Sequence, residues 1–315
     1  MRARLLFLVP LLAFAGVFTG TFAYYKLDSD DGLAPDTAAA QRIEAEGTLI
    51  VALERNPSVR LYSVAADGNG GHLLIDESEP ADGSVLVEAH PDWSPAANRI
   101  ALTRYTVEGE DAAVPKIWTV GPDGSGLAQL TSGESPDFLP AWSPDGTQIA
   151  FTREVRGSAE IFVMNADGSG VTQLTRDRTV NEEHPAWSPD GTHLAYTAGA
   201  EEENHLYVMS SDGSQATRLT SGPFWAADPA WAPKGDTIAF ICDTDLCLIG
   251  AEQGSRPTQL IGTRPKESSP RWSADGRQIA FARFPGGVFL YDLETKRTMR
   301  VPFAGETFSL SWGPA

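Results

Sequence analysis

Short apolar runs alternate with polar turns along the chain from about residue 48 onward. One group of such runs is "QIAFTR" (148–153), "EIFVMNADG" (160–168) and "VTQLT" (171–175). The Asp-Gly pair that ends the second run is typical of a hairpin turn. Because no helical period separates the runs, the pattern predicts antiparallel β-strands joined by short turns.

A tryptophan motif divides these runs into repeats. "PAWSPDGTQIAF" (140–151) returns as "PAWSPDGTHLAY" (185–196), "PAWAPKGDTIAF" (229–240) and "PRWSADGRQIAF" (270–281). The recurring tryptophans are spaced by 49, 45, 44, 41 and 40 residues, which is the period of a four-stranded propeller blade. We expect them to pack between neighbouring blades; they are Trp93, Trp142, Trp187, Trp231, Trp272 and Trp312.

The two ends of the repeat region complement each other. "SLSWGPA" (309–315) supplies a single strand, whereas "TLIVALE" (48–54), "VRLYSVAADG" (59–68) and "GHLLIDE" (71–77) supply three. The C-terminal strand is therefore predicted to join the N-terminal blade, which leaves no unpaired inner edge. The sequence predicts an all-β fold, a six-bladed β-propeller of four-stranded antiparallel blades over residues 47–315.

The segment "PAWSPDGTQIAFTREVRGSAEIFVMNADGSGVTQLT" (140–175) resembles the repeat of TolB-type propellers, also called WD40-like. The resemblance extends over residues 47–315. The motif departs from its usual form at "WSPAAN" (93–98), at Lys234 and at Ala274. The resemblance implies a non-catalytic propeller outside the cytoplasm that binds other proteins.

The N-terminal region differs from the repeats. Two arginines precede "LLFLVPLLAFAGVFTGTFAYY" (5–25), a run without charge that is long enough to cross a bilayer as a helix. We expect residues 1–25 to be a membrane anchor or a cleaved signal peptide, and residues 26–46 to be an acidic linker. The propeller is then membrane-anchored outside the cytoplasm, or secreted or periplasmic after cleavage.

Cys242 and Cys247 flank "DTDL" between two apolar runs. In a hairpin with a four-residue loop they would lie opposite each other, within disulfide distance. Export to an oxidising compartment favours the disulfide over a pair of reduced thiols. Two sulfurs without a nearby His or further Cys make a poor zinc site, and we expect no metal and no cofactor.

The overall charge restricts the partners. The chain has 42 acidic and 24 basic residues and a net charge of −18, which argues against nucleic acid. No G-x-S-x-G elbow and no H-E-x-x-H motif is present in the sequence, so we expect no enzyme activity. The sequence therefore favours a monomeric propeller with protein partners in the cell envelope.

Candidate binding residues precede the recurring tryptophans. Carboxylates stand five residues before four of them, and equivalent positions in a ring lie on a circle. They are predicted either to form an acidic channel mouth for a cation or a basic segment of a partner, or to hold their own loops by local hydrogen bonds. Three residues before the tryptophans stand further polar side chains, which we interpret as rim residues rather than metal ligands. The carboxylates are Glu88, Asp137, Glu182 and Glu267, and the rim residues are His90, His184 and Asp228.

Phe224 and Trp225 fall outside the repeat pattern. They are predicted to lie in a loop at the same mouth, where an exposed aromatic pair would suit a protein-binding hot spot. The alternative is a loop that packs against its own blade. The leading functional hypothesis is therefore a protein-binding propeller; a carbohydrate-binding or polysaccharide-lyase-like propeller and a passive scaffold are the alternatives.

The anchor interpretation makes a direct prediction. N-terminal sequencing of the protein isolated from cells should find residues 1–25 retained. A mature protein that begins after Ala15 or Ala23, where small-residue sites lie, would instead identify a signal peptide.

Overall fold

The computed structural model describes residues 45–55, 58–78, 80, 82–108, 111–200, 203–223, 225–262, 266–303 and 305–313. The expected N-terminal helix lies outside the described residues, as does all but the end of the expected linker. Within the described part, no helix is long and apolar enough to span a membrane. The chain there is folded into strands, as the alternating runs predict.

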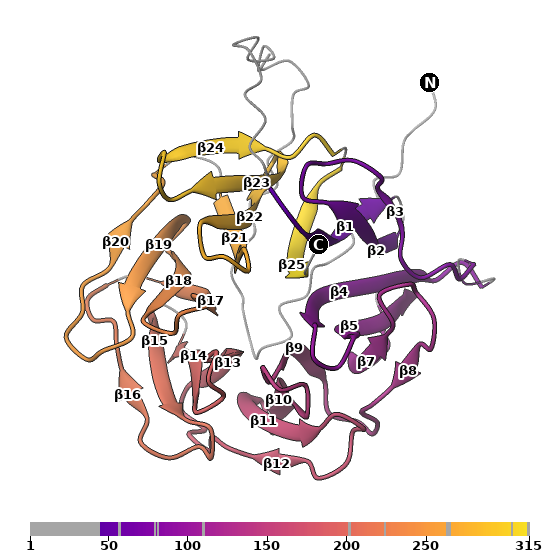
Figure 1. Ribbon diagram of the computed structural model, residues 1–315. Coiled ribbons are helices and arrows are strands. Elements are labelled where there is room, and N and C mark those ends of the chain that lie inside the picture. The colour runs from indigo at the N-terminus through magenta and orange to yellow at the C-terminus, as the bar shows by residue number, and fades with distance from the viewer. Residues whose placement is uncertain are drawn as a thin grey trace, which may run out of the picture.

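Four antiparallel sheets of four strands follow one another, and Figure 1 shows them arranged around a common centre. The first contains β9 (Asp137–Trp142), β10 (Gln148–Val155), β11 (Ser158–Asn165) and β12 (Thr172–Gln173). The second contains β13 (Asn181–Trp187), β14 (His193–Ala200), β15 (Glu203–Ser210) and β16 (Thr217–Arg218). The third contains β17 (Ala226–Trp231), β18 (Thr237–Cys242), β19 (Asp245–Gly250) and β20 (Thr258–Gln259). The fourth contains β21 (Lys266–Trp272), β22 (Gln278–Phe284), β23 (Gly287–Asp292) and β24 (Arg297–Arg300).

The remaining strands form one sheet of nine, in which β2 and β4 are joined by the single parallel pair Val59 and Val87. On one side of this junction lie β1 (Thr48–Arg55), β2 (Ser58–Ala65), β3 (His72–Leu73) and β25 (Thr307–Gly313). On the other lie β4 (Val85–Ser94), β5 (Arg99–Glu108), β6 (Asp111–Ala112), β7 (Lys116–Val120) and β8 (Ala128–Gln129). The expected pairing of the C-terminal strand with the N-terminal strands is present, because β25 pairs antiparallel with β1.

The core lies between neighbouring sheets and follows from the motif that each repeat carries. In "IAF" of β10, Ile149 and Phe151 pack against the preceding sheet, whereas Ala150 faces the following one. β18 repeats this arrangement with Ile238, Ala239 and Phe240. A small residue on one face gives room to the large side chains of the next sheet, so each sheet buries both of its faces.

Three of the recurring tryptophans also link adjacent sheets by hydrogen bonds. The indole Nε1–H of Trp187 donates to Ala141 O at 3.2 Å, that of Trp231 to Ala186 O at 3.1 Å, and that of Trp272 to Ala230 O at 3.0 Å. Each acceptor is the residue just before the tryptophan of the preceding sheet. These bonds therefore fix neighbouring inner strands side by side.

A disulfide joins Cys242 and Cys247, whose Cα atoms are 6.0 Å apart. The turn of this hairpin is shorter than expected. Cys242 pairs with Asp245, so that only Asp243 and Thr244 form the loop, and Cys247 lies opposite Phe240. Asp243 adopts a positive φ of 60°, which a tight two-residue turn favours and which Asp tolerates better than most residues.

The indole hydrogen bonds yield a stability prediction. Trp187→Phe should lower the free energy of unfolding by about 1 kcal/mol more than Trp142→Phe, because Trp187 loses an interstrand bond. Trp142 is the matched control, since its Nε1 is buried with no hydrogen-bond partner among the described residues. Chemical denaturation of both variants measures the difference. Equal losses would show that the indole bond contributes nothing.

Candidate functional site

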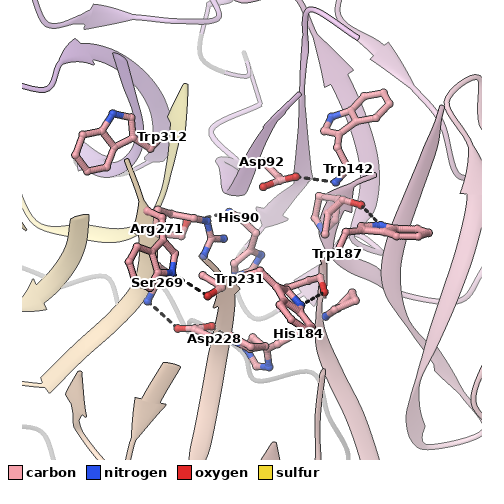
Figure 2. A pocket seen from close by; sticks show the side chains of 18 of the residues that line it. His90, Asp92, Trp142, His184, Trp187, Asp228, Trp231, Ser269, Arg271 and Trp312 are labelled. Atoms are coloured by element: carbon pink, nitrogen blue, oxygen red, sulfur yellow. Dashed lines mark hydrogen bonds and ion pairs between the residues drawn. The ribbon is translucent and has the colours of Figure 1, made fainter. Parts of the chain in front are cut away.

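The inner strands of the sheets, which surround the common centre in Figure 1, line a cavity of about 370 Å³. Six strands contribute to its wall: β4, β9, β13, β17, β21 and β25. The wall includes the residues three positions before the recurring tryptophans, namely His90, Leu139, His184, Asp228, Ser269 and Ser309. The structure thus brings together the three predicted rim residues (Figure 2). They line this cavity from different strands.

A bulge in each inner strand brings these residues to the cavity wall. In β9, Leu139 and Pro140 lie opposite the single residue Phe151, which shifts the register with β10. Leu139 has φ 55°, and His90, His184, Asp228 and Ser269 have values between 50° and 57°. In each of these five strands the residue with positive φ is followed by a proline. Proline has no N–H to donate to the neighbouring strand, and it disfavours the α-helical conformation of the residue before it. The left-handed conformation is therefore a repeated part of the architecture.

Asp228 joins three neighbouring strands. Its Oδ1 lies 3.1 Å from His184 Nε2, and its Oδ2 accepts a 2.8 Å hydrogen bond from the backbone N–H of Ser269. His184 Nδ1 in turn lies 3.3 Å from Thr197 Oγ1. Both carboxylate oxygens of Asp228 are therefore used within the protein.

His90 has a different environment, although it occupies the same position as His184. His184 contacts Asp228 of the next inner strand. At the equivalent place beside His90 the next inner strand carries Leu139, whose side chain has no hydrogen-bond acceptor. His90 Nδ1 lies 3.3 Å from Thr103 Oγ1, and Thr103 Oγ1 also accepts the backbone N–H of Leu139 at 3.2 Å. Burial, reinforced by His184 and Arg271, lowers the pKa of His90 to about 4, so its imidazole is neutral at neutral pH.

Two charged residues that sequence reasoning missed, Asp92 and Arg271, stand directly before a tryptophan and line the same cavity. Asp92 Oδ2 accepts the backbone N–H of Trp142 at 2.7 Å. Burial raises the pKa of Asp92, and the positive charge of Arg271 partly opposes this. The sequence signal that could have found them is a charged residue just before a recurring tryptophan, where the other repeats have a small residue. The residues at this position are Asp92, Ala141, Ala186, Ala230, Arg271 and Ser311.

The cavity shows no metal-ligand geometry. Among the described residues, no group of three His, Cys, Asp or Glu side chains could hold a metal ion. What the cavity offers is a mixture of imidazole, carboxylate and guanidinium groups surrounded by prolines and tryptophans.

The four predicted carboxylates are not among the residues that line the cavity, where a channel mouth would place them. Glu88, Asp137 and Glu267 have fully buried side chains, each within ion-pair distance of an arginine. Glu88 pairs with Arg60 and Arg104, Asp137 with Arg153, and Glu267 with Arg283. Glu88 and Glu267 also accept the backbone N–H groups of Leu61 and Leu246. The expected position at a channel mouth is therefore corrected. A buried carboxylate needs a cation or N–H donors beside it, and these residues have them. Their part in partner binding stays a prediction.

Glu182 is the exception among these carboxylates. Strand pairing sets Arg104, Arg153 and Arg283 opposite the other three acids, but it sets Ala198 opposite Glu182. Glu182 lies instead beside Thr175 and Glu160 of the preceding sheet, and Thr175 Oγ1 donates to Glu160 Oε2 at 2.9 Å. Burial, with the neighbouring Glu160, raises the pKa of Glu182 to about 7.

Trp225 is half-buried and directly precedes β17. Its backbone N–H donates to Asp243 Oδ1 at 2.9 Å, and its carbonyl accepts the N–H of Asp243 at 2.7 Å. The backbone of Trp225 is therefore bonded to the disulfide hairpin of its own sheet, and it also forms a β-bridge with Asn204 of the preceding sheet. Phe224 lies outside the described residues, and the binding role of the pair stays a prediction.

Antiparallel sheets of this size, arranged around a cavity lined by their inner strands, are the architecture of a β-propeller. Residues 50–248 match the TolB beta propeller domain, and the chain belongs to that family.

The chain is also similar to individual proteins and to a solved structure. The chain is 32% identical over 189 residues to a protein named TolB homolog from Chlorobium luteolum, which covers 58% of the chain and 33% of that protein. A stretch of 94 residues is 29% identical to the uncharacterized peptidase YuxL of Bacillus subtilis, covering 29% of the chain and 14% of that protein. The crystal structure of TolB from Acinetobacter baumannii superposes with a TM-score of 0.71 at 21% identity, covering 85% of this chain and 67% of that one. The chain spans about a third or less of the length of these two sequence relatives.

The Glu160–Glu182 pair predicts a pH-dependent stability. Because the pKa of Glu182 is higher in the folded state than its usual 4.5, the stability contributed by its protonated form is complete below about pH 4.5 and is lost as the pH rises through 7. Glu182→Gln should therefore match the parent protein at pH 4.5 and exceed it by about 2 kcal/mol at pH 8.

Denaturant unfolding at several pH values tests this. Glu267→Gln is the matched control and should destabilise at neutral pH, because it weakens the buried pair with Arg283. If the difference between Glu182→Gln and the parent protein does not change with pH, the pKa of Glu182 is not raised in the folded state.

Proposed function

We propose that this chain is a non-catalytic six-bladed propeller, exported and membrane-tethered, that binds a protein partner of the cell envelope through its central cavity. The observation that carries the proposal is the cavity itself, in which the bulged inner strands present polar side chains among prolines and tryptophans. Proline and aromatic walls with few, well-placed polar groups suit the capture of a peptide segment.

The count of six blades rests on the pairing within the nine-stranded sheet. Only one residue pair joins β2 to β4, whereas β4 and β5 pair over eight. Divided at this junction, the sheet yields one blade around β1, β2, β3 and β25 and another around β4, β5, β7 and β8. With the four separate sheets, the blades then number six, each with one inner strand on the cavity.

Relatives and sequence support the cellular setting. The matched proteins include one named TolB homolog, and the apolar segment 5–25 provides an export signal or anchor. The predicted linker 26–46 would hold the propeller away from the bilayer. The polar groups of the cavity support binding rather than chemistry, because Asp228 and His184 are engaged with each other and with neighbouring strands.

Site-specific photo-crosslinking in the native cell envelope tests the proposal. With p-benzoylphenylalanine at Ala186, which lines the cavity, we expect a discrete adduct with one envelope protein. The same group at Val171, an exposed residue ahead of the outer strand β12, is the matched control and should give none. Adducts from neither position, or equally from both, would contradict binding at the cavity.

A further inference from the structure

Arg271 stands at a position where two of the other five inner strands carry a side-chain acceptor. The residue before the tryptophan lies beside the next inner strand, and two such residues accept the N–H of that strand's tryptophan. Ser311 Oγ accepts from Trp93 at 2.9 Å, and Asp92 Oδ2 accepts from Trp142 at 2.7 Å. A guanidinium group has five N–H donors and no acceptor, so Arg271 cannot make this bond.

Among the described residues, the donors of Arg271 are largely unused. One Nη1–H donates to Pro270 O at 2.9 Å, and no carboxylate among the described residues lies within ion-pair distance of it. In Figure 2 its side chain extends into the cavity, toward the side on which His90 lies. Arg104, Arg153 and Arg283, which pair with the buried carboxylates, also lie over aromatic rings, whereas Arg271 lines the cavity.

His90 supplies a second donor on the same cavity. Thr103 Oγ1 already accepts the N–H of Leu139, so its own hydroxyl hydrogen is available for His90 Nδ1. In this arrangement the single proton of the neutral imidazole is on Nε2. His184 directs its Nε2 to Asp228, but Leu139 leaves His90 without such a partner on the next strand.

Asp92 completes the set with an acceptor. Its Oδ2 is occupied by Trp142, and Oδ1 remains for a ligand N–H group. Its charge also keeps a bound anion from shifting away from Arg271 toward β4. The cavity therefore presents donors for a carboxylate beside an acceptor for an N–H group, which is the combination found on a peptide.

We propose that the cavity binds a carboxylate of the partner, held by the Arg271 guanidinium and His90 Nε2–H, while Asp92 accepts an adjacent peptide N–H. The proposal rests on the proposed protein-binding function and adds the chemistry of the bound segment. A volume of about 370 Å³ lies near the lower end for ligand pockets and suits a chain end or one acidic side chain. The carboxylate comes from a C-terminus or from an Asp or Glu side chain.

Three synthetic peptides distinguish these sources: acetyl-Gly-Gly-Gly with a free carboxylate, the same peptide as its amide, and acetyl-Gly-Glu-Gly amide. They are titrated into the full-length protein, and binding is followed by intrinsic fluorescence, because five tryptophans line the cavity. We expect one or both of the carboxylate peptides to bind and the uncharged amide to bind at least about tenfold more weakly.

Arg271→Ala is the decisive variant. Alanine occupies this position in β9, β13 and β17, so the fold accepts it there. It should weaken carboxylate binding at least about tenfold, and Arg271→Lys should retain part of it. His90→Leu, which copies Leu139 of the next strand, should also weaken binding. Arg277→Ala, on the turn of the same sheet, is the matched control and should leave it unchanged.

Equal binding of the amide, no binding of either carboxylate peptide at 10 mM, or an unaffected Arg271→Ala variant would overturn this inference. The crosslink from Ala186 separates that failure from a failure of the proposed function. An adduct that persists in Arg271→Ala, with no carboxylate binding, would leave a protein-binding cavity of another chemistry. If the protein with the crosslinker at Ala186 and no other change gives no adduct, both the proposed function and this inference are contradicted.

Discussion

The indole hydrogen bond between neighbouring inner strands is the contact on which the centre of the molecule depends. Trp187, Trp231 and Trp272 each reach back to the carbonyl that precedes the tryptophan of the sheet before. Because acceptor and indole come from the same place in successive repeats, one geometry recurs at the three junctions between β9, β13, β17 and β21. The spacing of the inner strands β9, β13, β17 and β21, and with it that part of the cavity wall, follows from this repeated bond.

Charge is arranged in two separate layers. Between sheets, carboxylates meet arginines in buried pairs, so much of the acidic character at these positions is neutralised inside the protein. Near the axis, side chains from the bulged strands are less completely paired, and the guanidinium of Arg271 faces the cavity. The net charge of −18 therefore says little about the field that a ligand meets at the centre.

Much of the fold could be predicted from the sequence, because the features that specify it are local. Alternating runs, Asp-Gly turns and a tryptophan every 40 to 49 residues identify strands, hairpins and repeats. The outer strands were less predictable: "VTQLT" contributes only Thr172 and Gln173 to β12, since a sheet edge is paired on one side alone. The short turn at Asp243 was also missed, because strand register depends on the partner strand.

The site was only partly predictable, because its side chains are positioned by bulges. Counting back from each tryptophan located His90, His184 and Asp228, which the cavity brings together. For Glu88, Asp137 and Glu267 the same counting left a channel mouth and local hydrogen bonds as alternatives. Their arginine partners become visible only once the strands are paired. A proline after the left-handed residue is the sequence signal for the bulge, and it explains why a simple alternation of faces fails there.

The pairing of β1 with β25 has a consequence for how the molecule is made. Thr48 pairs with Gly313, and Trp312 Nε1 donates to Glu46 O, so groups 266 residues apart in the chain must meet. Until residues 307–313 arrive, one edge of β1 has unpaired N–H and C=O groups that another strand could occupy. Contacts of such separation form slowly. During synthesis, the most vulnerable species is therefore the nearly complete ring, in which that edge is still open to a neighbouring copy.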